Sequence, residues 1–165
     1  MITTVSLRDA LLDAAKEVFE TMVFMAMEEA KDDASCLSSE STADAEATLL
    51  GSITFKGSLE GCLGICCTTG CARTIAANML GMDPSEEIGE DDISDAVGEV
   101  ANMVMGAVKS RIQDEVGSIE VSIPSVVQGR KLKNSLGEGA SRVSVAANIE
   151  EEYTARFSLL YREGA

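Results

Sequence analysis

Apolar residues recur at helical spacing near the start of the chain and predict a long amphipathic helix over residues 6–31. The positions that share its apolar face are Leu7, Leu11, Ala14, Val18, Met22 and Met25. Ser6 and Asp9 have the spacing of a capping box at the start of this helix. The polar, serine-rich residues 31–46 that follow predict a solvated connection rather than a domain boundary.

A second long helix is predicted over about residues 93–115, where apolar residues again fall on one face. These residues are Ile93, Val97, Val100, Val104 and Val108. Asp91 or Asp92, at the end of the acidic loop 82–92, can cap this helix. A shorter helix is predicted over residues 70–81, closed by Gly81.

Alternation of apolar and polar residues predicts strands in the remaining ordered parts of the chain. Residues 48–55 and 62–69 form a hairpin through the turn 56–61, and residues 142–149 and 154–161 form a second pair. Between them lie a strand-like stretch at 118–128 and a flexible, locally basic loop at 129–141. Pro124 lacks an N–H for strand pairing, which predicts an edge position or a bulge in that stretch.

An internal repeat suggests how these elements are organised. The segment "DAAKEV" begins at Asp13 and "DAVGEV" begins at Asp95, 82 residues later, each within a long helix that precedes a strand hairpin. The matching order predicts one α+β domain over residues 1–165, with pseudo-two-fold halves at about 7–81 and 89–162. Two long helices would pack on an antiparallel β-sheet.

Charge and composition exclude several classes of partner. The 165 residues carry a formal net charge of −15, which disfavours nucleic acid and anionic membrane surfaces. No apolar run reaches the roughly 18 residues that span a bilayer, and the N-terminal residues do not resemble a secretory signal. We therefore expect a cytoplasmic protein whose five cysteines are reduced.

The cysteine-rich segment "CLGICCTTGC" invites a metal-site hypothesis, but its spacing does not favour one. Cys62, Cys66, Cys67 and Cys71 lack the paired C-x2-C spacing of zinc ribbons, and the chain contains no His. With a period of two, Leu63, Ile65 and Cys67 would face one side of a strand, opposite Cys62 and Cys66. Buried thiols that act as small hydrophobes explain the segment, and we expect no metal site.

The most informative polar residues lie on the second long helix, opposite its valine face. Asp95, Glu99, Asn102, Gly106 and Ser110 share this outward stripe. A face left only to water is the alternative, but Gly98, Asn102 and Gly106 together cost about 2–2.5 kcal/mol of helix propensity relative to alanine. Glycines allow another backbone or a ligand to approach, and Met103 and Met105 can supply adaptable contact area. The pattern favours a docking face.

The two central polar groups suggest a chemistry for that face. The carboxamide of Asn102 does not titrate near neutral pH, but it can hold a water by donating one hydrogen bond and accepting another. A water held in this way can be aimed at an electrophile, as in phosphoryl transfer. The carboxylate of Glu99 could pair with a cation on the partner and fix the register of docking.

These residues resemble the signature of the CheC/CheX family of chemotaxis phosphatases, and in particular its CheX branch. The segment "DAVGEVANMVMG" has the family's acid, Glu and Asn at Asp95, Glu99 and Asn102. Pro124 in "SIPSVVQG" is similar to a trailing proline of the family, and "ITFKGSLEG", "ARTIAANMLG" and "FETM" also resemble the CheX branch. The resemblance covers about residues 8–162.

The resemblance implies a specific function. Asn102 would enter the active site of a phosphorylated CheY-type response regulator and position the water that hydrolyses its aspartyl phosphate, while Glu99 would pair with a regulator lysine. Asp95, Gly98, Met103 and Gly106 would contact the regulator. The regulator would hold the Mg²⁺ that the reaction needs, so this chain would need no cofactor of its own. The resemblance also implies a homodimer joined through its sheets.

Within the repeat, the first half departs from this signature. Glu17 aligns with Glu99, but Glu20 aligns with Asn102, and a carboxylate there would repel a phosphoryl group. Phe19 and Phe24 also make the first helix bulkier. We therefore expect one working site per chain.

There are two alternatives to a phosphatase. One is a non-catalytic adaptor that binds a response regulator or a signalling or flagellar complex, and the other is a plain dimerisation module.

Overall fold

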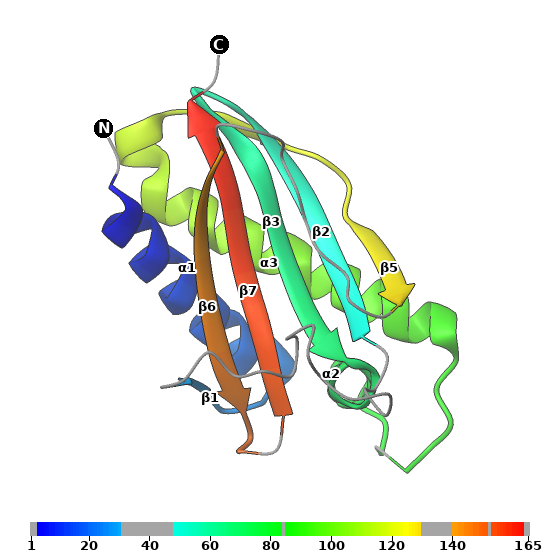
Figure 1. Cartoon of the computed structure of the whole chain (residues 1–165). Helices are drawn as coiled ribbons and strands as arrows, with labels where there is room; N and C mark the ends of the chain where they lie inside the picture. Colours follow the sequence, from blue (N-terminus) through cyan, green and yellow to red (C-terminus); the bar gives the residue numbers. More distant parts are fainter. Residues whose placement is uncertain (1–2, 31–47, 84, 130–139, 152, 164–165) are drawn as a thin grey trace.

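The predicted α+β architecture is confirmed by the computed structural model, which describes residues 3–30, 48–83, 85–129, 140–151 and 153–163 (Figure 1). Within these residues, seven strands form one antiparallel sheet, in the order β1-β6-β7-β3-β2-β4, with β5 also pairing with β2. The long helices α1 and α3 lie together behind this sheet in Figure 1. None of the described helices is long and apolar enough to cross a membrane.

Both predicted hairpins are present, with longer strands than the sequence pattern indicated. Strands β2 (Thr48–Gly57) and β3 (Leu59–Thr68) form the first, and β6 (Ser141–Ile149) and β7 (Tyr153–Glu163) form the second. Strand β3 also pairs with β7, which joins the two hairpins into one sheet. Each hairpin follows a long helix in the chain; the duplication itself stays a prediction.

The predicted strand at 118–128 divides at Pro124 into β4 (Ile119–Val121) and β5 (Ser125–Gly129). Both segments pair antiparallel with β2, so they form an interrupted edge of the sheet. This arrangement confirms the prediction made for Pro124, because a residue without an N–H is tolerated at an edge interruption. The predicted loop at 31–46 lies outside the described residues, as do residues 130–139 of the loop predicted over 129–141.

The prediction that the first helix continues to residue 31 is wrong. Helix α1 spans Thr4–Val18, continues as a π-helical turn, η1 (Phe19–Val23), and ends at Phe24, whose backbone is left-handed with φ 60°. Strand β1 (Met27–Glu29) then pairs with β6. Met25 and Met27 lie in the non-helical segment that follows Phe24, and both are buried, whereas Met22 is 51% exposed. Helical spacing alone could not show that pairing with a distant strand would bury these methionines.

The caps of the two long helices also differ from the prediction. Thr3, rather than Ser6 with Asp9, caps α1, because its side chain accepts a hydrogen bond from the Ser6 backbone N–H. Helix α3 (Glu90–Val116) begins at the N-cap Gly89, which has no side-chain cap. Asp91 and Asp92 instead lie in its first turn, where carboxylates interact favourably with the helix dipole.

The short helix α2 (Thr69–Leu80) confirms its prediction, and Gly81 ends it with φ 68°. The core forms between the sheet and the long helices. Val97, Val100, Val104 and Val108 of α3 are each at most 1% exposed. A side chain at Gly51 of β2 would place its Cβ 3.0 Å from Val97 Cγ1, so α3 lies directly on the sheet. This close packing fixes which face of α3 points outward.

Candidate functional site

The outward stripe of α3 has the orientation that its spacing predicts. Asp95, Glu99, Asn102, Gly106 and Ser110 are all exposed, whereas the valines on the other face lie in the core. Because the valine face is held against the sheet, the stripe is presented by a rigid element rather than a loop. A site that must place a water accurately benefits from such support.

Glu99 and Asn102 stand three residues apart, a spacing that brings Cβ atoms within about 5–6 Å on a helix surface. No hydrogen bond or ion pair joins either side chain to another described residue. The amide can therefore donate and accept toward a visiting molecule, and the carboxylate can pair with a visiting cation. The structure brings together the two groups that the sequence selected.

Gly98 has a different environment from the one expected of a docking residue. It is buried, and a Cβ there would lie 3.5 Å from Val126 Cγ2 and 3.7 Å from Pro124. Pro124 and strand β5 therefore cover this position. Met105 is also fully buried, so it cannot flank an exposed stripe as predicted. At Gly98 the physical reason is that Pro124 and Val126 pack on α3, a contact that the pattern of one helix cannot reveal.

Met103 and Gly106 keep the predicted surface positions. Met103 is half-buried, and Gly106 is exposed; apart from its chain neighbours and the backbone of its own helix, no atom lies within 4 Å of the place where a Cβ would stand. Both line a hollow of about 430 Å³ between α1 and α3, here called the α1–α3 groove. Its other lining residues are Glu17, Val18, Thr21, Met22, Ala107, Ser110 and Arg111.

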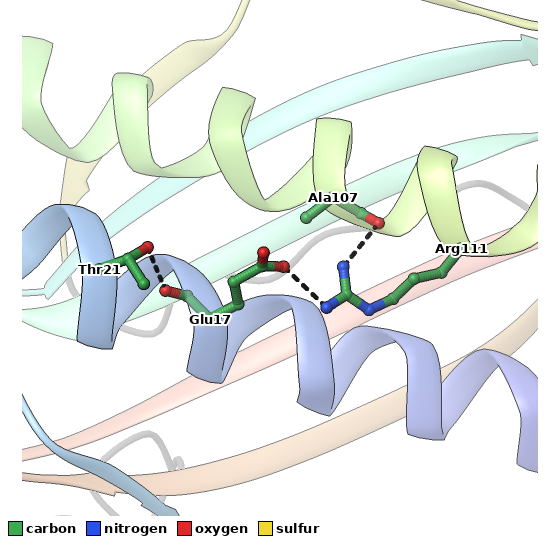
Figure 2. A network of polar contacts seen from close by, with 4 residues as sticks. All are labelled: Glu17, Thr21, Ala107 and Arg111. Carbon is green, nitrogen blue, oxygen red and sulfur yellow. Dashed lines mark hydrogen bonds and ion pairs between the residues drawn. The ribbon is translucent and has the colours of Figure 1, made fainter.

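An ion pair lies across one part of the α1–α3 groove (Figure 2). The guanidinium of Arg111 donates to Glu17 Oε2 at 2.7 Å and to the Ala107 carbonyl at 3.1 Å. The hydroxyl of Thr21 donates to the Glu17 carbonyl at 2.6 Å. Glu17, which aligns with Glu99 in the predicted repeat, is thus held by the chain's own arginine. Sequence reasoning missed Arg111, since no local pattern relates residues on two different helices.

A second hollow, of about 500 Å³, lies where α2 and α3 begin, beside β2 and β5. It is lined by Leu49, Thr69, Gly70, Arg73, Ile88, Glu90, Ile93 and Gln128, none of which was predicted as a site residue. Arg73 in this hollow donates to the carbonyl of Glu86. The hollow contains neither Glu99 nor Asn102, so it is separate from the predicted site.

The four described cysteines, Cys62, Cys66, Cys67 and Cys71, are buried. Leu63, Ile65 and Cys67 belong to the main core, as the period of two predicted. Burial raises the pKa of the Cys62 and Cys66 thiols, which keeps both neutral at ordinary pH. Among the described residues, no group of three or more His, Cys, Asp or Glu side chains is placed to hold a metal ion.

Comparisons with known proteins agree with the fold. The chain is similar to a chemotaxis protein CheX from Vibrio vulnificus, with a TM-score of 0.75, 23% identity, and coverage of 98% of this chain and 100% of that one. A CheC-like superfamily protein from Shewanella sp. PV-4 matches with a TM-score of 0.73, 25% identity, and coverage of 96% and 98%. A chain of the CheX–CheY–BeF3–Mg²⁺ complex from Borrelia burgdorferi matches with a TM-score of 0.66, 15% identity, and coverage of 94% and 97%. A search of curated proteins gave no match.

Fold and site together define an α+β domain that presents a carboxylate and a carboxamide from one rigid helix. The family model described as "Chemotaxis phosphatase CheX" matches residues 49–148, a segment that runs from β2, without its first residue, through β3, α2, α3, β4 and β5 to most of β6. The chain belongs to the CheX family.

Proposed function

We propose that this protein hydrolyses the aspartyl phosphate of a CheY-type response regulator. The observation that carries the proposal is the exposed Glu99–Asn102 pair on the outward stripe of a CheX-family domain. A relative with the same fold occurs in a complex with CheY, BeF3 and Mg²⁺, which supports a partner of this kind.

In the proposed reaction, Asn102 enters the regulator's active site and holds a water in line with the phosphorus atom. The water oxygen bonds to phosphorus, and the bond from phosphorus to the aspartyl oxygen breaks, which yields inorganic phosphate and a free carboxylate. Positioning of this kind can supply much of the rate enhancement in phosphoryl transfer. Glu99 pairs with a regulator lysine, and Asp95 adds negative charge beside it on the same stripe.

The Mg²⁺ that the resemblance implies would belong to the regulator rather than to this chain. Glu99 and Asp95 are the carboxylates near Asn102 on α3, and they do not form a cluster of three potential ligands. This donor set suits docking to a cation on a protein better than it suits holding a metal. The proposal therefore includes no cofactor resident in this chain.

The proposal also includes one working site per chain and a homodimer. The first rests on Glu17, which is paired with Arg111, and on Glu20, which cannot donate a hydrogen bond as an amide can. The homodimer rests on the family resemblance, and sedimentation equilibrium of the purified protein tests it. A mass equal to one chain would remove that part of the proposal.

The experiment is the decay of a CheY-type regulator phosphorylated with acetyl phosphate and Mg²⁺, with and without catalytic amounts of this protein. Asn102→Ala is expected to lower the acceleration on the order of 100-fold while regulator binding persists. Asn102→Asp is expected to lose as much, since its charge repels the phosphoryl group. Asn148→Ala, which removes an exposed amide from β6, is the matched control and should retain full activity.

The outcomes separate this proposal from the adaptor hypothesis. Tight regulator binding without faster decay would favour a non-catalytic adaptor. If neither binding nor faster decay occurs with any regulator of the organism, the domain would act as a dimerisation module. Full activity of Asn102→Ala would show that the water is positioned by another group.

A further inference from the structure

We propose that the α1–α3 groove receives an apolar side chain of the response regulator and thereby sets how tightly the regulator binds. This inference rests on the proposed function, since it places the partner over Asn102. It assigns to the first half of the repeat, which lacks the water-positioning amide, a role in recognition rather than in chemistry.

The groove continues directly from the proposed catalytic residue. Met103 follows Asn102 in the chain, and Gly106 lies one turn further, about 6 Å along the helix axis. A stable protein partner covers about 800 Å² of surface. A regulator that brings its phosphoryl group to Asn102 must therefore also lie over the groove.

The shape of the groove suits one inserted side chain. Gly106 leaves open space, because no atom of another element lies within 4 Å of the position that a Cβ would occupy. Met22, which is 51% exposed, and the half-buried Met103 contribute flexible apolar walls. Methionine side chains adapt to different partners, and such surfaces are common at protein-binding sites. An aliphatic or aromatic side chain fits this lining.

The charges around the groove also indicate the chemistry of the partner. Glu17 and Arg111 neutralise each other across the groove, so its lining carries no net charge (Figure 2). The exposed carboxylates of Asp95 and Glu99 lie on α3, one of the two helices that form the groove. A complementary surface has an apolar side chain at its centre and cations beside it, which is compatible with the regulator lysine proposed for Glu99.

The end of α1 is built in an unusual way that positions Met22. The helix widens into the π-turn η1, and Phe24 adopts a left-handed backbone that costs of order 1–3 kcal/mol. The Met25 N–H donates to the Phe19 carbonyl at 2.9 Å and closes this turn. Single π-turns are frequent at functional sites, and this one carries Met22 at the edge of the groove.

The test compares two substitutions at Gly106. Alanine and leucine have similar helix propensities, but only leucine fills the groove. Gly106→Leu is expected to raise KM for the phosphorylated regulator about tenfold relative to Gly106→Ala, with the kcat values of the two variants within twofold of each other. Met22→Ser, which removes one apolar wall at an exposed position, should raise KM several-fold. Circular dichroism and urea unfolding of each variant establish that it is folded.

Equal KM values for Gly106→Leu and Gly106→Ala would overturn the inference, as would a loss in kcat alone. If the wild type does not accelerate decay, the proposed function fails, and binding of the BeF3-treated regulator then tests the groove by itself. Weaker binding of Gly106→Leu than of Gly106→Ala would support the groove as an adaptor surface. Equal binding of these variants, or no binding by the wild type, would overturn it.

Discussion

Gly98 and Gly106 lie on the same helix but have opposite surroundings, and this contrast predicts opposite responses to a large side chain. At Gly98, a Cβ would stand 3.5–3.7 Å from Val126 and Pro124, which is ordinary van der Waals contact. Alanine therefore fits. Leucine would place further atoms where Pro124 and Val126 already pack. At Gly106 there is open space, so both residues fit.

The magnitudes follow from helix propensity and overpacking. Replacing glycine by alanine inside a helix stabilises by about 0.5–1 kcal/mol, and we expect this gain at both positions. Leucine should match alanine at position 106 to within about 0.5 kcal/mol. At position 98 leucine should be less stable than alanine by about 1–3 kcal/mol, the usual cost of overpacking. For a domain of this size, each 1 kcal/mol corresponds to about 2–4 °C in Tm.

Urea unfolding followed by circular dichroism at 222 nm measures these differences, since the chain has no Trp for fluorescence. The four variants carry alanine or leucine at position 98 or 106 of the same helix, so each serves as a control for another. Equal stabilities of the leucine and alanine variants at position 98 would refute the packing of Pro124 and Val126 on α3. A destabilising Gly106→Ala would refute the open space beside that position.

Three further predictions test other parts of the structure. Glu20→Ala should leave phosphatase activity within twofold, because the first half lacks the water-positioning amide; a large loss would show that the two halves have been assigned wrongly. A double-mutant cycle of Arg111→Ala and Glu17→Ala should give a coupling of about 0.2–1 kcal/mol that falls in 1 M NaCl, since both side chains are partly exposed; a coupling above 2 kcal/mol would contradict this. Mass-spectrometric mapping should find Cys62 and Cys66 unlabelled by iodoacetamide at pH 8 until urea unfolds the protein, because burial raises the pKa of both thiols; labelling of the native protein would contradict their burial.

The site was predictable from the sequence as far as its chemistry depends on one helix. Helical periodicity is a local property, so the valines of α3 identified the core face and placed Glu99 and Asn102 outside it. The same pattern could not distinguish Gly98 from Gly106. Their difference depends on Pro124, which reaches α3 only because the edge of the sheet passes over it.

Local rules therefore determined the two hairpins, the glycine that ends α2, the outward stripe and the family resemblance, because each depends on residues close together in the chain. Tertiary structure decided where the first helix ends, since Met27 is buried by strand pairing with Ile149. It also joined Glu17 to Arg111, 94 residues later, and opened the groove beside Gly106. Contacts between distant residues depend on how the helices lie on the sheet, and the spacing of apolar residues within one segment carries no information about that arrangement.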